Sequence, residues 1–181
     1  MWKSLVLALT LVSSSVFAGP KVTFETNLGP FTVELNQEKA PISVANFMKY
    51  VDDGSYVGSQ FHRVIPNFMA QGGGFDQEMN RLPTYAPITN EATNGLSNKT
   101  ATIAMARTND PNSATRQFYI NLVDNNFLDY KQRPPGYAVF GEVTQGFNVI
   151  QNMAKKPTTA KQGMRDVPVE PIIITAVSVE K

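Results

Sequence analysis

The sequence contains no cysteine, a single histidine and almost no excess of charge. Without cysteine, a disulfide framework, a thiol nucleophile and a zinc–thiolate site are all excluded. One histidine also excludes a metal site built from several histidines. Sixteen Lys and Arg against fifteen Asp and Glu leave a net charge of +1, far from the basic excess that binding of nucleic acid phosphates requires. We therefore expect no nucleic acid partner, no metal and no cofactor.

A hydrophobic run long enough to cross a membrane is also missing. The main apolar run, residues 5–12, is less than half of the roughly 20 residues that a spanning helix needs. It follows the positive charge of Lys3 and precedes Val16-Phe17-Ala18, an acceptable small-residue cleavage site. We expect residues 1–18 to be a cleaved signal peptide, residues 19–181 to be the mature domain, and no stable membrane insertion.

The remaining chain has the composition of one ordinary globular domain, with 42% hydrophobic residues and no repeat or linker. Residues 21–26 and 31–35 alternate apolar and polar side chains around Asn27-Leu28-Gly29-Pro30, which predicts a hairpin. Further strands are predicted at residues 60–65, 101–106, 117–122, 137–143 and 172–179. Many short strands with few helices indicate an antiparallel sheet closed into a barrel.

Two helices interrupt the strands. Pro41 and Gly54 are typical start and stop signals around a first helix. Its apolar residues recur at helical spacing: Val44, Phe47, Met48 and Val51. A second apolar stripe predicts a helix over residues 146–156, ended by Pro157. The long polar stretch over residues 72–98 is uncommon as an idle loop, so we expect it to contribute to a binding surface.

The most specific segment is FHRVIPNFMAQGG at residues 61–73, in which an arginine, large apolar groups and a glutamine precede two glycines. Its composition alone indicates only an edge strand with a mixed surface. The segment resembles the signature of the cyclophilin family of peptidyl-prolyl cis-trans isomerases. Later blocks of that family follow in order, namely IAMAR at 103–107, residues 113–121, FLD at 127–129 and YAVFG at 137–141. The resemblance covers nearly all of the mature chain and is greatest to exported bacterial cyclophilins with short loops.

The resemblance implies a mainly β fold, a closed eight-stranded antiparallel β-barrel capped by two α-helices. It also implies an enzyme that accelerates rotation about X-Pro peptide bonds and assists the folding of exported proteins. The expected partners are proline-containing peptides and unfolded or partly folded exported proteins, the expected compartment is the periplasm, and the expected state is a monomer. The alternative is a non-catalytic binding or holdase module that captures proline-containing segments in the same groove.

The resemblance assigns catalytic roles to Arg63 and Gln71. A guanidinium is a permanently charged, directional donor, so Arg63 is suited to bond the prolyl nitrogen when the amide loses its resonance, or to hold the adjacent carbonyl. A pure binder has no use for such a donor, which favours the enzyme over the holdase. Gln71 would orient Arg63 and bond the substrate, whereas His62 is interpreted as a structural residue. The implied substrate-binding residues are Phe68, Met69, Ala106, Arg107, Gln117, Tyr119, Phe127, Leu128 and Tyr137.

Three of these positions depart from the familiar eukaryotic pattern. Phe127 stands where many relatives have tryptophan, Tyr137 where they have histidine, and Tyr119 where they have phenylalanine. Loss of the indole removes an N–H donor but keeps an apolar wall. We therefore expect catalysis to survive while binding of the family inhibitor cyclosporin is weak.

Tyr119 belongs to a strand whose alternation separates two faces. Gln117 and Tyr119 are two residues apart and share one face, whereas Phe118 and Ile120 are predicted to point to the core. Of the implied set, Phe68, Met69, Tyr119 and Leu128 would line the pocket for the proline ring. The Tyr119 hydroxyl at this apolar pocket costs free energy unless a partner or water satisfies it.

Overall fold

The computed structural model describes residues 19–180, so the expected signal peptide lies outside the described residues. The strands are β1 (Lys21–Thr26), β2 (Gly29–Leu35), β3 (Arg63–Ile65), β4 (Met69–Gly72), β5 (Thr102–Met105), β6 (Phe118–Asn121), β7 (Val139–Gln145), β8 (Thr158–Lys161), β9 (Met164–Pro168) and β10 (Ile174–Val179). The helices are α1 (Pro41–Asp52), the 3-10 turn η1 (Asn126–Leu128) and α2 (Phe147–Met153). The fold is therefore mainly β with two α-helices.

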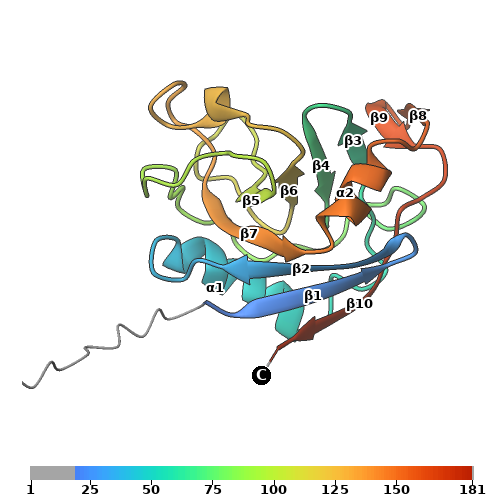
Figure 1. Ribbon diagram of the computed structural model, residues 1–181, viewed down its shortest axis with the longest axis horizontal. Helices are drawn as coiled ribbons and strands as arrows, with labels where there is room; N and C mark the ends of the chain where they lie inside the picture. The colour runs from blue at the N-terminus through green and yellow to red at the C-terminus, as the bar shows by residue number, and fades with distance from the viewer. Residues whose placement is uncertain (1–18, 181) are drawn as a thin grey trace, which may run out of the picture.

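Eight strands form one antiparallel sheet in the order β10-β1-β2-β7-β5-β6-β4-β3, and β8 and β9 form a separate hairpin. The sheet curls strongly, so that β1, β2 and β10 lie across from β3 and β4 (Figure 1). Its two end strands, β3 and β10, are not neighbours in the ladder. The chain before β3 makes the contact instead: Gly58 N–H donates to Ile174 O at 2.8 Å, and Phe61 N–H donates to Ile172 O at 2.9 Å.

The expected closed barrel is thus replaced by a strongly curled half-barrel. The chain that reaches β10 lies just before β3 and meets it through the isolated bridge between Gln60 and Ile173, so no continuous ladder joins the two ends of the sheet. The predicted hairpin is confirmed as β1 and β2, and the first helix is confirmed as α1. The second helix is shorter than predicted because Gly146 has a left-handed φ of 74° and the chain turns after Met153.

The main core fills the inside of the curl. Phe24 of β1 stacks on Phe31 of β2 with ring centroids 5.2 Å apart. Phe47 of α1 reaches the same space and meets Phe118 of β6 edge to face at 5.6 Å. On the other helix, α2, Ile150 is fully buried in the same cluster. Because both helices bury their apolar stripes here, this core accounts for the helical spacing in the sequence.

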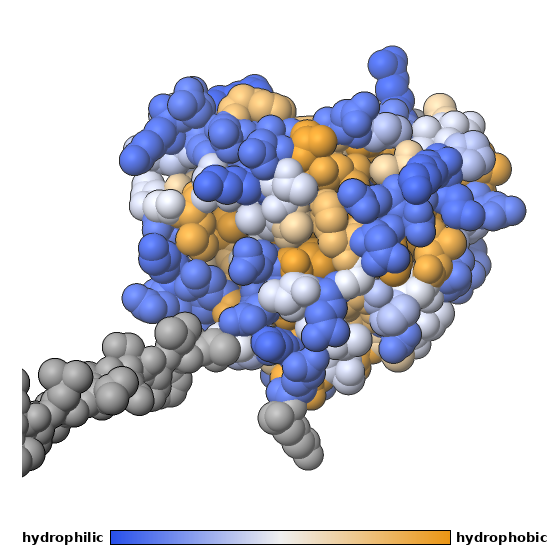
Figure 2. Space-filling model, in the orientation of Figure 1, coloured by the Kyte–Doolittle hydropathy of each residue, from blue (hydrophilic) through white to orange (hydrophobic). Residues whose placement is uncertain are grey.

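One face of the molecule is largely polar (Figure 2). Figure 2 shows hydrophilic side chains over much of one face, with apolar side chains gathered in smaller areas between them. Among residues 19–180, no helix is long and apolar enough to cross a membrane.

A second, smaller apolar cluster lies apart from the main core. It consists of the buried residues Met69, Ala104, Tyr119, Leu128 and Val139. Three of these belong to β4, β5 and β6, the strands that also supply the main core. The outer face of these strands is therefore apolar too, and it forms the base of the site described next.

Candidate active site

The strand register builds one row of side chains across the outer face of the sheet. Arg63 of β3 pairs with Gln71 of β4, Gln71 pairs with Tyr119 of β6, and Tyr119 pairs with Ala104 of β5. Directly paired residues of neighbouring strands point to the same face of a sheet. The fold therefore brings a cation, an amide and a phenol into one line.

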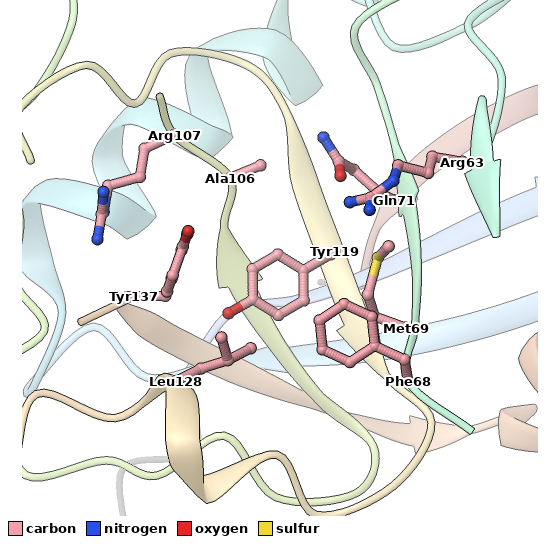
Figure 3. Close-up of a pocket in the computed structure, with 9 residues that line it drawn as sticks. All are labelled: Arg63, Phe68, Met69, Gln71, Ala106, Arg107, Tyr119, Leu128 and Tyr137. Carbon is pink, nitrogen blue, oxygen red and sulfur yellow. The ribbon is translucent and has the colours of Figure 1, made fainter. Parts of the chain in front are cut away.

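A pocket of about 120 Å³ opens along this row. Figure 3 shows its lining side chains grouped around the Tyr119 ring. The lining consists of Arg63, Phe68, Met69, Gln71, Ala106, Arg107, Tyr119, Leu128 and Tyr137. Pockets for drug-sized ligands usually measure roughly 300–1,000 Å³, so this one is suited to a single ring or side chain. Two residues of the expected set, Gln117 and Phe127, are not part of this lining.

The apolar side of the pocket is formed around Phe68 and Met69. Met69 is almost fully buried, whereas Phe127 is 51% exposed and stacks on Phe68 with ring centroids 5.9 Å apart. Phe127 therefore extends the apolar surface beyond the pocket. The Phe68 carbonyl accepts hydrogen bonds from Leu122 N–H at 2.9 Å and from the Asn125 amide at 2.8 Å. Asn125 thus holds the backbone beneath Phe68, a role that its sequence position did not indicate.

The hydroxyl of Tyr119 has a partner. It donates to Asn98 Oδ1 at 2.7 Å, and Asn98 is fully buried. The Asn98 side-chain amide donates to Asp129 Oδ1 at 2.9 Å. Burial raises the pKa of the Tyr119 phenol well above 10, so the phenol stays protonated and acts as a donor. The hydrogen bond offsets the cost expected for a hydroxyl at an apolar pocket.

Two amides stand beside the cation at the polar end of the pocket. The Gln71 amide donates from Nε2 to Gln117 Oε1 at 2.9 Å. This bond occupies one end of the Gln71 amide and directs its carbonyl oxygen the other way. Gln117 therefore acts on the pocket by orienting Gln71. Figure 3 shows the Arg63 guanidinium reaching from β3 over Gln71 toward the pocket.

His62 lies beside Arg63 in sequence but is buried, with its ring 4.6 Å from that of Phe75. Burial lowers the pKa of His62 from 6.5 to about 4, and the nearby charge of Arg63 contributes to this shift. The imidazole is therefore neutral at neutral pH, which agrees with a packed, structural residue.

No group of three or more His, Cys, Asp or Glu within residues 19–180 is arranged to hold a metal ion.

The opposite wall is held by a cation over an aromatic ring. The Arg107 guanidinium lies 4.2 Å from the centroid of the Tyr137 ring, and its Nε and Nη2 donate to Gly136 O at 3.0 and 2.8 Å. Tyr137 in turn meets Tyr119 edge to face at 6.0 Å. Next to them, Ala106 N–H donates to Gln117 O at 3.0 Å. These contacts connect the side chains of the wall to one another and to the backbone.

Comparison with known proteins agrees with this geometry. The family described as cyclophilin type peptidyl-prolyl cis-trans isomerase/CLD matches residues 21–179. A peptidyl-prolyl cis-trans isomerase of Acinetobacter baylyi is 48% identical over 177 residues, which cover 98% of this chain and 94% of the relative. Peptidyl-prolyl cis-trans isomerase B of Escherichia coli is 47% identical over 164 residues, with 88% of this chain and 99% of the relative covered.

Solved structures show the same fold. A cyclophilin type peptidyl-prolyl cis-trans isomerase of Cryptosporidium parvum superposes with a TM-score of 0.74 at 22% identity, covering 90% of this chain and 98% of that one. Family match, named relatives and fold agree over nearly the whole described chain. The chain therefore belongs to the cyclophilin family and is a peptidyl-prolyl cis-trans isomerase.

Proposed function

We propose that the pocket holds the proline ring of the substrate and that Arg63 stabilises the twisted prolyl bond. The observation that carries this proposal is the cross-strand row, which aligns the Arg63 guanidinium with the rim of a ring-sized apolar pocket. Gln71 stands between the guanidinium and Tyr119 in that row and bonds the substrate backbone.

The chemistry needs few groups. Resonance opposes rotation about a peptide C–N bond with a barrier of roughly 18–20 kcal/mol, and an X-Pro bond isomerises unaided in tens to hundreds of seconds. No covalent bond is made or broken. In the twisted state the nitrogen becomes pyramidal and basic, so a donor aimed at it stabilises the transition state more than the ground state. A 10⁵-fold acceleration requires about 7 kcal/mol, shared among Arg63, desolvation and positioning.

The apolar lining supplies the remaining contacts. Phe68, Met69 and Leu128 offer a socket for the ring, and the Tyr119 ring forms its base because its hydroxyl is bound elsewhere. The backbone of Arg107 and the small side chain of Ala106 receive the residues beside proline. A structure of the Cryptosporidium parvum relative, at 23% identity, was determined in the presence of the dipeptide Ala-Pro. It supports a proline-containing peptide as the ligand of this fold.

The binding mode is tested by NMR with residues 19–181 and a short peptide that contains Ala-Pro. We expect nuclear Overhauser contacts between the proline ring protons and the side chains of Phe68, Met69 and Leu128. A matched peptide with alanine in place of proline is the control and is expected to lose these contacts. Contacts of the proline ring with another surface, and none with these three residues, would contradict the proposal.

We also propose that the enzyme is exported and acts on unfolded or partly folded exported proteins in the periplasm. The support is the charged start, short apolar run and Val16-Phe17-Ala18 site, together with a family match that begins at residue 21, just past the expected cleavage. Expression of the full chain is expected to give a periplasmic protein whose measured mass matches a chain that begins at Gly19. An uncleaved cytoplasmic protein would contradict export.

The role in folding is tested with a secreted protein whose refolding is limited by a prolyl bond. Wild-type enzyme is expected to accelerate the slow phase, and Arg63→Ala is expected to leave it slow while still binding the unfolded chain. If Arg63→Ala assisted folding as well as wild type does, binding alone would carry the effect, and the holdase interpretation would replace the catalytic one.

A further inference from the structure

We propose that Asp166, on the β8–β9 hairpin, is a positioning residue that sets the orientation of the Arg63 guanidinium. The inference rests on the role of Arg63 proposed above. Asp166 Oδ2 lies 4.0 Å from Arg63 Nε, and the two side chains are 40% and 42% exposed. These residues are far apart in the sequence and meet because β9 packs beside β3.

A bulge in the hairpin presents Asp166. Pairing of Thr159 with Val167 and of Lys161 with Met164 leaves one residue of β8 opposite two of β9, Arg165 and Asp166. Asp166 adopts a left-handed φ of 61°, which few residues other than glycine adopt and which aspartate and asparagine tolerate best. Bulges of this kind redirect a side chain and are common beside active sites. The bulge thus turns the carboxylate toward β3.

The hairpin is anchored on both sides of this bulge. Val167, the residue after Asp166, is fully buried, and Val169 N–H donates to Pro157 O at 2.9 Å. At the tip, the Gln162 amide donates to Glu78 O at 3.0 Å. Figure 1 shows β8 and β9 beside β3 at the edge of the sheet. The backbone at Asp166 is therefore placed by packing and hydrogen bonds of the hairpin on both sides of it.

The geometry of the contact leaves the reactive end of the arginine free. Arginine has one N–H at Nε and two at each Nη, all in one plane. A carboxylate 4.0 Å from Nε is too far away for a hydrogen bond, so it acts on the guanidinium through its charge. Its attraction draws the Nε side toward the hairpin and leaves the Nη groups for the pocket, toward which they reach in Figure 3. The same negative charge sits next to the cation without lining the pocket. Asp166 therefore orients Arg63 and has no direct contact with the prolyl bond.

The test uses Asp166→Asn, which keeps the shape and the tolerance of positive φ but removes the charge. We expect kcat to fall about fivefold with KM unchanged, the size of effect that one exposed ion pair supports. High salt is expected to lower the wild-type kcat toward that of the variant and to leave the variant unaffected, because salt screens exposed charges. The NMR signal of the Arg63 Nε–H group is expected to shift in Asp166→Asn.

Glu170→Gln is the matched control, since it removes one exposed negative charge close to the hairpin and is expected to change neither kcat nor the Arg63 signal. Asp166→Gly, which permits the same backbone and deletes the carboxylate, is expected to behave like Asp166→Asn. Wild-type kcat and an unchanged Arg63 signal in both Asp166 variants would overturn the inference.

Arg63→Ala is measured in the same series to separate this inference from the proposed function. Full activity in Arg63→Ala would contradict the proposed function itself. Loss of activity in Arg63→Ala together with wild-type kcat in Asp166→Asn would overturn only the role of Asp166. If both single variants lose activity and the double variant is no less active than Arg63→Ala, the result supports a carboxylate that acts through the arginine.

Discussion

The two faces of β4, β5 and β6 differ in how their side chains are held. On the inner face, Phe118 and Ile120 of β6 are fully buried among aromatic rings and helix side chains. On the outer face, the Tyr119 hydroxyl donates a hydrogen bond to Asn98 and the Gln71 amide donates one to Gln117. The same strands therefore carry a packed core on one side and, on the other, a site with an apolar base whose polar groups have single hydrogen-bond partners.

This difference separates stability from function. Inner residues contact many neighbours and require no specific partner atom, so their replacement leaves a cavity. Outer residues meet single partners that arrive from loops and from the β8–β9 hairpin, where the Asp166 carboxylate lies 4.0 Å from Arg63 Nε. We expect changes inside the curl to lower the free energy of unfolding. Changes in the outer row, the cross-strand row of Arg63, Gln71, Tyr119 and Ala104 on the outer face, are expected to alter catalysis or binding with a smaller effect on stability.

The largest effect on stability is expected for Phe118→Ala. Phe118 is fully buried and contacts Phe24, Phe47, Tyr56 and Phe61 at ring distances of 5.5 to 5.9 Å. Its truncation is expected to lower the free energy of unfolding by about 3–5 kcal/mol. Urea unfolding measures this loss. Retained stability with lost isomerase activity would reverse the roles that we assign to the two faces.

A slightly smaller loss of stability is expected when the pH falls, because His62 is buried in its neutral form. The pKa of His62 is about 4 in the folded chain against 6.5 when unfolded, so the unfolded chain binds a proton first as the pH falls. Stability is expected to drop by about 3 kcal/mol in total as the pH falls from above 6.5 to below 4. Urea unfolding at several pH values checks this, and His62→Gln is expected to flatten the dependence in that window. An equally steep dependence in the variant would assign the drop to other groups.

A smaller change is expected for Tyr119→Phe on the outer row. The variant removes the donor to Asn98 Oδ1 and leaves that buried oxygen with a longer bond from Asn121 at 3.3 Å. We expect a loss of about 1 kcal/mol in stability and a nearly unchanged isomerisation rate, because the ring stays in place. Thermal unfolding and a peptide isomerisation assay measure the two effects. A large loss of rate would mean that the hydroxyl itself meets the substrate.

An effect of comparable size concerns the binding of cyclosporin at the rim of the pocket. Phe127 is exposed and supplies an apolar wall without an N–H donor. Phe127→Trp restores such a donor and is expected to tighten cyclosporin inhibition about fivefold, the value of one hydrogen bond of about 1 kcal/mol. Inhibition of isomerase activity measures this change. Sub-micromolar inhibition of the wild-type protein would contradict the weak binding expected for Phe127.

The inner face could be predicted from the sequence because its signal is local. Alternation along β6 placed Phe118 and Ile120 inside and Tyr119 outside, and helical spacing identified the buried stripe of α1. The hairpin over residues 158–168 gave no such signal, since most of its side chains are exposed and its apolar residues do not alternate. The closed barrel was expected both from the many short strands and from the family likeness, but the end strands β3 and β10 do not pair, and a strongly curled half-barrel results.

The outer face was only partly predictable. The cyclophilin motif identified the residues that line the pocket, but their partners come from loops whose positions depend on the whole fold. Asn98 ends a polar stretch with no periodicity, and Asp166 reaches Arg63 only through a bulge. Gln117 and Phe127 were expected at the pocket, whereas one lies beside Gln71 and the other stacks outside Phe68. Strand register and loop contacts are long-range properties that single residues do not encode.

The most direct test of the account is the rate of cis-to-trans relaxation of an Ala-Pro peptide with residues 19–181, compared between wild type and Arg63→Ala. Circular dichroism and urea unfolding establish that the variant keeps its fold. We expect the wild-type acceleration to fall by about 10²–10³-fold in Arg63→Ala, the usual effect of removing one preorganised donor. An equal rate in the two proteins would contradict the claim that the outer row, through Arg63, performs the catalysis.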